Sequence, residues 1–134
     1  MFENDYIMRQ IRGMAAVLAR LLFGKSATEY VLPAETFGEA DRLHLELVKR
    51  IEEGRLEEAE NLLFDRLDPA DPDTLKVALD FYARLEKLDP AYLSAHGFTE
   101  DDIALGLAHA AAAFGHDDAA RVFLTFLSEK ERDP

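Results

Sequence analysis

The sequence predicts an all-α protein of five to six helices, and three observations lead to this prediction. Apolar residues recur at helical spacings along most of the chain. Glycine and proline fall mostly between these periodic segments, where helices would end. No strand pattern competes with this periodicity. We therefore expect a single helical domain over residues 1–134, with an N-terminal amphipathic helix in residues 1–25 and a body of helical hairpins in residues 39–129.

The first helix is predicted from about Asn4 to Phe23, and Gly24 can end it in a left-handed conformation. Apolar residues along it follow a heptad pattern, which is typical of a helix that packs against another helix. It is also apolar over more than half of its circumference, so something must cover it. The residues of this seam, which we predict to mediate self-association, are Ile7, Ile11, Met14, Leu18 and Leu21.

Three interpretations of this helix stay open at the level of the sequence. It can pack into the core of the single chain, or it can form a homodimer through the heptad seam. It can also lie on a membrane surface, with arginines at the rim and its apolar end inserted. In that case the rim would be Arg9, Arg12 and Arg20, and the inserted residues would be Leu21, Leu22 and Phe23.

A helical hairpin is predicted where helices over residues 39–53 and 56–67 meet at Gly54. Glycine can close the first helix, and Ala59 is small enough to let the second helix pack close to it. This spacing is typical of tetratricopeptide-like hairpins.

The same glycine-to-alanine interval recurs at Gly115 and Ala120. The two copies are 61 residues apart, which is not a multiple of the tetratricopeptide period of about 34 residues. The sequence therefore leaves two architectures open: tetratricopeptide-like hairpins or an irregular α-helical bundle.

The remaining helices are predicted from their caps and breakers. Asp71 and Pro72 can begin a helix that Pro90 stops. Thr99 can cap the next helix, with Asp102 completing a capping box, and Gly115 can end it. We expect helices over about 72–88, 99–113 and 117–129, a short turn at 91–96, and a charged tail from residue 128 that frays.

Composition excludes several functional classes. The chain has 134 residues, a formal net charge of -12 and no cysteine. The negative charge argues against a nucleic-acid partner, and the lack of cysteine excludes disulfides, thiolate metal sites and thiol nucleophiles. The longest apolar runs are far shorter than the ~20 residues that a membrane span needs. The N-terminus lacks the basic segment of a secretory signal, so we expect a cytoplasmic protein.

No motif in the sequence predicts catalysis. The chain contains no glycine-rich phosphate loop, no G-x-S-x-G and no H-E-x-x-H. His109 and His116 are seven residues apart, which places them ~10 Å from each other along a helix. That is too far apart to share one metal ion unless Gly115 turns the chain back. His44 is expected to be a buried or half-buried polar residue. We therefore predict no enzyme activity and no cofactor, and the acidic surface favours a basic or largely apolar ligand.

Four blocks of the sequence resemble a family of small bacterial helical proteins of unknown function. They are N-D-Y-I-M-R-Q-I (Asn4 to Ile11), L-L-F-G-K (Leu21 to Lys25), E-A-E-N-L-L-F (Glu58 to Phe64) and A-L-D-F-Y-A-R-L (Ala78 to Leu85). The resemblance implies a tetratricopeptide-like helical fold and a bacterial, cytoplasmic setting, and it assigns no catalytic residue.

The sequence thus predicts a non-catalytic protein-protein interaction or assembly module that self-associates through its N-terminal helix. The expected partner is a second copy of the chain or another protein. A membrane-surface adaptor that inserts the N-terminal helix is the alternative, and an enzyme of unknown type is the third possibility.

Overall fold

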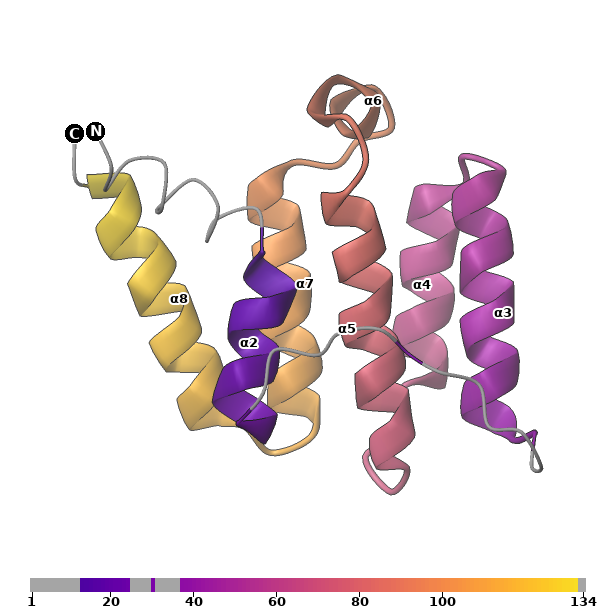
Figure 1. Ribbon diagram of the computed structural model, residues 1–134, viewed down its shortest axis with the longest axis horizontal. Coiled ribbons are helices and arrows are strands. Elements are labelled where there is room, and N and C mark those ends of the chain that lie inside the picture. Colours follow the sequence, from indigo (N-terminus) through magenta and orange to yellow (C-terminus); the bar gives the residue numbers. More distant parts are fainter. Residues whose placement is uncertain (1–12, 25–29, 31–36, 133–134) are drawn as a thin grey trace.

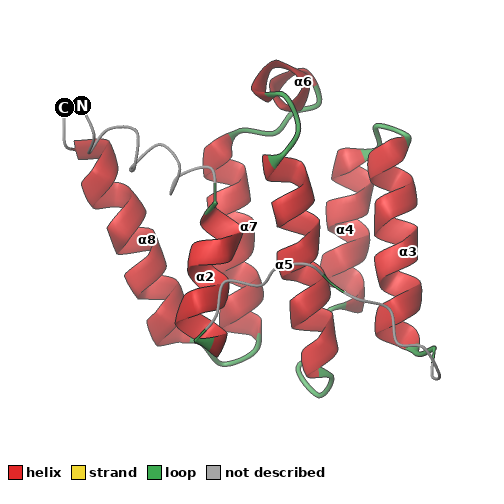
Figure 2. Cartoon of the chain, in the orientation of Figure 1, coloured by secondary structure: helices red, strands yellow, loops and turns green. Residues whose placement is uncertain are grey.

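A computed structural model describes residues 13–24, 30 and 37–132 (Figure 1). These residues form seven helices and no strand, which confirms the all-α prediction for this part of the chain (Figure 2). The helices are α2 (Met14–Phe23), α3 (Glu39–Glu52), α4 (Leu56–Arg66), α5 (Pro72–Glu86), α6 (Pro90–Ala95), α7 (Glu100–Ala113) and α8 (Asp117–Arg132).

The helices form two hairpins with a central helix between them. The α3–α4 hairpin stands at one end of the molecule and the α7–α8 hairpin at the other, with α5 between them (Figure 1). Helix α5 packs against α3, α7 and α2. Helix α2 is the first of the described helices in the sequence, yet it packs against α5, α7 and α8, in the half of the molecule that the C-terminal helices form.

The core is centred on α5, which buries nine of its fifteen residues. Its largest side chains, Phe81 and Tyr82, are at most 1% exposed and meet edge to face with ring centroids 4.9 Å apart. Helix α7 packs against α5, α8 and α2. Small residues on its buried faces, such as Ala108 and Ala111, let these helices approach it closely. Burial of large apolar side chains, at about 1.5–3 kcal/mol each, is the main stabilising contribution.

The predicted helix ends are confirmed where the signals were local. Gly54 and Gly115 have φ of 75° and 82°, the left-handed region in which glycine carries no Cβ penalty. The side chain of Asp71 accepts a hydrogen bond from the N–H of Asp73 at 3.1 Å. Thr99 and Asp102 form the predicted capping box, with reciprocal hydrogen bonds of 3.2 and 2.9 Å.

Two predictions in the C-terminal half were wrong. The segment expected to be a short turn at 91–96 is the helix α6, because Asp89 caps it through the N–H of Ala91 at 2.8 Å and Pro90 suits the first helical position. The tail expected to fray from residue 128 continues α8 as far as Arg132.

The structure describes only the second half of the predicted N-terminal helix. The structure describes it as α2 from Met14 onward, and the predicted seam residues Ile7 and Ile11 lie outside the described residues. Met14 and Leu18 are 3% and 0% exposed in the single chain, because this face of α2 packs on the central helices. Leu21, the last seam residue, is 46% exposed. Of the three interpretations, the packing of α2 agrees with a place in the core of the monomer.

Candidate functional site

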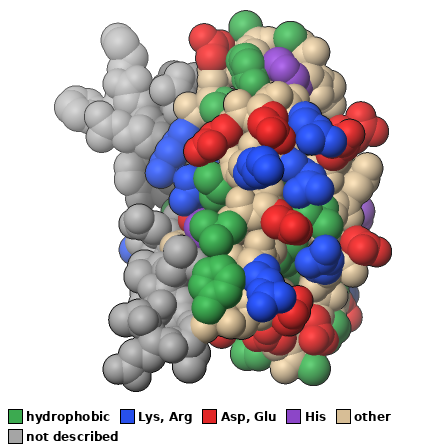
Figure 3. Space-filling model, turned by 90° about the vertical axis from the view of Figure 1, so that its right-hand side faces the viewer, with side chains coloured by type: hydrophobic (Ala, Val, Ile, Leu, Met, Phe, Trp, Pro, Cys, Tyr) green, Lys and Arg blue, Asp and Glu red, His purple; other side chains and the backbone are tan. Residues whose placement is uncertain are grey.

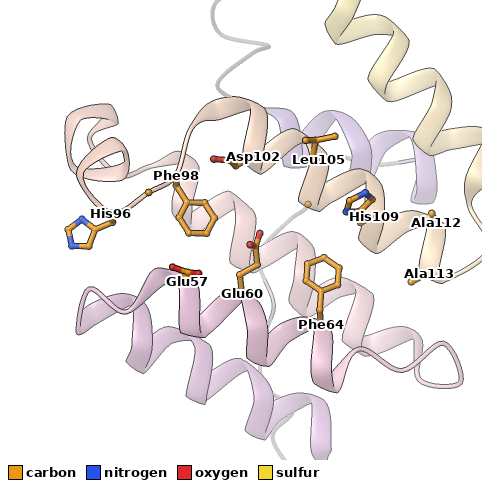
Figure 4. A pocket seen from close by; sticks show the side chains of 12 residues that line it. Glu57, Glu60, Phe64, His96, Phe98, Asp102, Leu105, His109, Ala112 and Ala113 are labelled. Atoms are coloured by element: carbon orange, nitrogen blue, oxygen red, sulfur yellow. The ribbon is translucent and has the colours of Figure 1, made fainter.

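A groove of about 800 Å³ lies between α4 and α7 (Figure 4). The connection between α6 and α7 contributes its remaining wall. The close-up shows side chains from the two helices facing each other across the opening. Its principal lining residues are Glu57, Glu60 and Phe64 from α4, and Asp102, Leu105 and His109 from α7.

A buried tyrosine of α5 determines how the groove is built. Tyr82 is 0% exposed, and its hydroxyl donates a hydrogen bond of 2.7 Å to Oε2 of Glu60. The ring passes directly beside Gly106 of α7, where an added Cβ would collide with the phenol and come within 2.8 Å of its Cε1 atom. Burial, and then the charge of Glu60, raise the pKa of the Tyr82 phenol above its usual range, so the hydroxyl stays a donor. One carboxylate oxygen of Glu60 is therefore held in a fixed position.

Electrostatically, the groove is acidic. Glu57, Glu60 and Asp102 line it, and no lysine or arginine does so among the described residues. Within the same part of the chain, none of these three carboxylates forms an ion pair. Glu60 is half-buried, whereas the other two are exposed. The groove thus concentrates negative charge that no described cation neutralises.

The outer side of the α3–α4 hairpin has a different charge pattern. Acidic and basic side chains alternate on this face of the molecule (Figure 3). Arg55 pairs with both Glu53 and Glu58, and Arg66 lies 3.8 Å from Glu46. Three acidic residues of this hairpin, Glu46, Glu53 and Glu58, thus have cationic partners, whereas none of the three groove carboxylates has one among the described residues.

Apolar side chains of the groove are exposed on both of its walls. Phe64 of α4 is 37% exposed and Leu105 of α7 is 48% exposed. Phe98 is buried at one end of the groove, and Ala112 and Ala113 line it further along α7. The groove therefore combines apolar anchoring positions with carboxylates, which suits an amphipathic ligand better than a purely polar one.

Two aromatic side chains, one from α6 and one from its C-cap, face the α3–α4 turn at one end of the groove. The rings of Tyr92 and His96 stack with centroids 4.1 Å apart. Both lie against the α3–α4 turn, where a Cβ on Gly54 would come within 3.1 Å of the Tyr92 hydroxyl and 3.3 Å of His96 Nε2. Gly54 therefore provides space for α6 as well as ending α3.

The structure separates the histidines that the sequence analysis considered. His109 lines the groove, and His116 lies beyond the end of α7. Within the described ranges, no three histidine, aspartate or glutamate side chains lie close enough to hold a metal ion. His44 is 6% exposed, as expected for a buried polar residue, and it belongs to a second group of polar residues, which does not line the groove.

This second group of polar residues links Tyr30 to α3 and α5 through hydrogen bonds. Asp80 accepts hydrogen bonds from the backbone N–H of Tyr30 at 3.1 Å and from Nε of Arg84 at 2.7 Å, and it lies 3.3 Å from Nδ1 of His44. The Tyr30 hydroxyl donates to Asp41 at 2.5 Å, and this bond is the main cause that lowers the pKa of Asp41. Burial lowers the pKa of His44, which keeps it neutral. These polar groups are one another's hydrogen-bond or ion-pair partners, so we interpret the cluster as one that stabilises the fold.

A third feature is a half-buried carboxylate at the end of α5. Glu86, at the end of α5, accepts hydrogen bonds of 2.8 Å from the backbone N–H groups of both Met14 and Ala15. It therefore caps α2, whose own N-cap, Gly13, has no side chain to do so. Burial raises the pKa of Glu86 to about 7, although the two N–H hydrogen bonds act in the opposite direction.

Sequence reasoning missed the residues that build the groove. Gly106 interrupts an alanine- and leucine-rich helix, and a glycine within a helical pattern is a signal for a close packing contact. That signal identifies no partner, and nothing in the sequence links Gly106 to Tyr82 or Tyr82 to Glu60.

Comparison with known proteins identifies a family but no activity. The model described as "Family of unknown function (DUF6483)" matches residues 1–115. No curated protein and no solved structure matches the chain. Within the described residues, no helix combines the length and the apolar character required to span a bilayer. The chain belongs to this family of unknown function.

Proposed function

We propose that this member of the family is a non-catalytic protein-protein interaction module that holds a helical segment of another protein in the α4–α7 groove. One observation carries the proposal: Phe64 and Leu105 are exposed on opposite walls of the same groove. Large apolar side chains exposed within a concave site are typical of binding surfaces.

A helical ligand fits the arrangement of the walls. An amphipathic helix presents apolar side chains at spacings of three and four residues and can lay that face into a groove between two helices. The apolar lining extends along α7 from Leu105 to Ala113. The recurrence of the Gly54–Ala59 spacing in the second hairpin further supports a tetratricopeptide-like interaction scaffold.

The test uses a defined peptide and two matched variants. The probe is an amphipathic helix of about 15 residues with leucines on one face and only alanine and glutamine elsewhere. Leu105→Ser alters the groove, and Leu45→Ser is its control, because Leu45 is 45% exposed on α3 away from the groove. We expect NMR amide shifts concentrated on α4 and α7, and binding that Leu105→Ser weakens and Leu45→Ser preserves. Equal effects of the two variants, or no shifts, would contradict the proposal.

Self-association through the N-terminal helix is a second proposal. It is supported by Leu21 and Phe23, which are 46% and 38% exposed at the end of α2. Since Met14 and Leu18 are already buried within the chain, Leu21 and Phe23 are the large apolar residues of α2 that remain for a dimer among the described ones. Light scattering should show a dimer for the full chain and a monomer for Leu21→Gln, and a monomeric full chain would rule the proposal out.

A further inference from the structure

We infer that the α4–α7 groove selects a cationic amphipathic helix and that Glu60, oriented by Tyr82, recognises its positive charge. This inference rests on the proposed function and adds to it the charge of the partner and the residue that recognises that charge.

Glu60 occupies the central position in the groove. It lies between Phe98 and Phe64 and extends toward α7 (Figure 4). An apolar ligand face anchored on the two walls would therefore bring its neighbouring side chains close to this carboxylate. Because Glu60 is half-buried, a charge beside it is screened less than a charge beside Glu57 or Asp102, which are exposed.

The hydrogen bond from Tyr82 prepares Glu60 for this role. It engages Oε2 from beneath, at 2.7 Å, and leaves Oε1 available to a ligand. The phenol is fully buried and so takes up no space in the groove. A carboxylate that is already held in place loses less conformational entropy when it binds a cation, and Tyr82 is thus a positioning residue.

The charges of the molecule favour a cationic protein segment over other occupants. None of the three groove carboxylates has a cationic partner among the described residues, so a ligand carrying lysine or arginine would supply one. The net charge of -12 disfavours a second copy of this chain, nucleic acid and an anionic membrane at this site.

Three peptides of identical leucine face, about 15 residues long, test the inference. Their polar faces carry lysine, glutamine or glutamate, and their affinities are measured by fluorescence anisotropy in about 20 mM salt and again in about 0.5 M salt. We expect the lysine peptide to bind about tenfold more tightly than the glutamine peptide, and the glutamate peptide to bind most weakly. This preference should shrink at the higher salt concentration.

Two charge-matched variants separate recognition from general attraction. Glu60→Gln and Glu52→Gln each remove one negative charge, but Glu52 is exposed on α3 outside the groove. We expect Glu60→Gln to abolish most of the preference for lysine and Glu52→Gln to retain it. Tyr82→Phe should give an intermediate loss, on the order of threefold, because the carboxylate remains but is no longer held. Circular dichroism checks that each variant is folded, and Glu60→Gln leaves the core side chains intact.

The outcomes distinguish the two proposals. If none of the peptides shifts the groove resonances, the proposed function fails and this inference fails with it. If the glutamine peptide binds the groove but the lysine peptide binds no more tightly, the inference is overturned and the proposed function stands. If Glu60→Gln and Glu52→Gln weaken the preference for lysine equally, the inference is also overturned, because the preference would then depend on the overall charge of the protein and not on Glu60.

Discussion

Replacement of Glu86 by glutamine should change how the stability of the protein depends on pH. Glu86 joins the end of α5 to the start of α2 through hydrogen bonds of 2.8 Å to the N–H groups of Met14 and Ala15. Glutamine has nearly the same shape and cannot ionise. The variant therefore removes the titration of this site while it keeps one acceptor oxygen for the helix.

The direction and size of the effect follow from the pKa. Burial raises the pKa of Glu86 from 4.5 to about 7, and the charge of Glu100 on α7 acts in the same direction. The folded chain thus holds a proton at pH values where the unfolded chain has released it. Stability from this group is fully present below pH 4.5 and is lost as the pH rises through 7, and the difference corresponds to about 3 kcal/mol. Against a total stability of about 5–15 kcal/mol, this change is large.

Urea denaturation followed by circular dichroism, at intervals between pH 4.5 and 8, measures this effect. The informative quantity is the difference in unfolding free energy between Glu86→Gln and the wild type, because all other titrating groups are common to both. We expect this difference to move in favour of the variant by about 3 kcal/mol from the lowest to the highest pH. A flat difference, or movement in the opposite direction, would refute the reasoning and show that the N–H hydrogen bonds outweigh burial at Glu86.

Three further predictions concern packing and capping. Leu18→Ala should destabilise the chain by about 2–5 kcal/mol, since Leu18 is fully buried. Leu21→Ala, at the exposed end of the same helix, should change stability by no more than about 0.5 kcal/mol. Thermal unfolding compares the two variants, and equal effects would contradict the placement of α2. Gly106→Ala should destabilise the chain by about 1–3 kcal/mol despite the higher helix propensity of alanine, because the new Cβ overlaps Tyr82. This destabilisation should largely vanish in a Tyr82→Leu background. Additive free energies in the double-mutant cycle would therefore exclude the contact. Thr99→Ala should lower the unfolding free energy by about 1 kcal/mol through loss of the α7 cap, and an unchanged urea midpoint would argue against that cap.

Most of the helices could be predicted from the sequence because their signals are local. The period of the apolar residues places α3, α4, α5 and α7 within about two residues of their observed bounds. The capping box at Thr99 and the left-handed glycines act within a single helical turn, so they can be recognised from neighbouring residues alone. Helix α6 was missed because six residues are too few to show a period.

The candidate site could not be predicted, because its contacts join residues that are distant in the chain. Tyr82 and Glu60 are 22 positions apart, and neither position shows a pattern that points to the other. His109 was considered only as a possible metal ligand, whereas the structure makes it one wall residue of a groove. The spacing of Ile103 and Leu107 identifies the buried face of α7, but nothing in the sequence indicates that Leu105, on the other side of that helix, faces Phe64 across a groove.

The sequence by itself determined that the chain is helical, that it is strongly acidic, and where most of its helices begin and end. These properties depend on composition and on interactions within one or two helical turns. Only the tertiary structure decided where α2 packs, since its apolar face would satisfy a monomer core, a dimer or a membrane equally well. The capping of α2 by Glu86, 72 positions away from Met14, illustrates the physical reason. Three-dimensional packing decides which residues cover an apolar face or cap a helix end, and these residues cannot be recognised from the sequence near that helix.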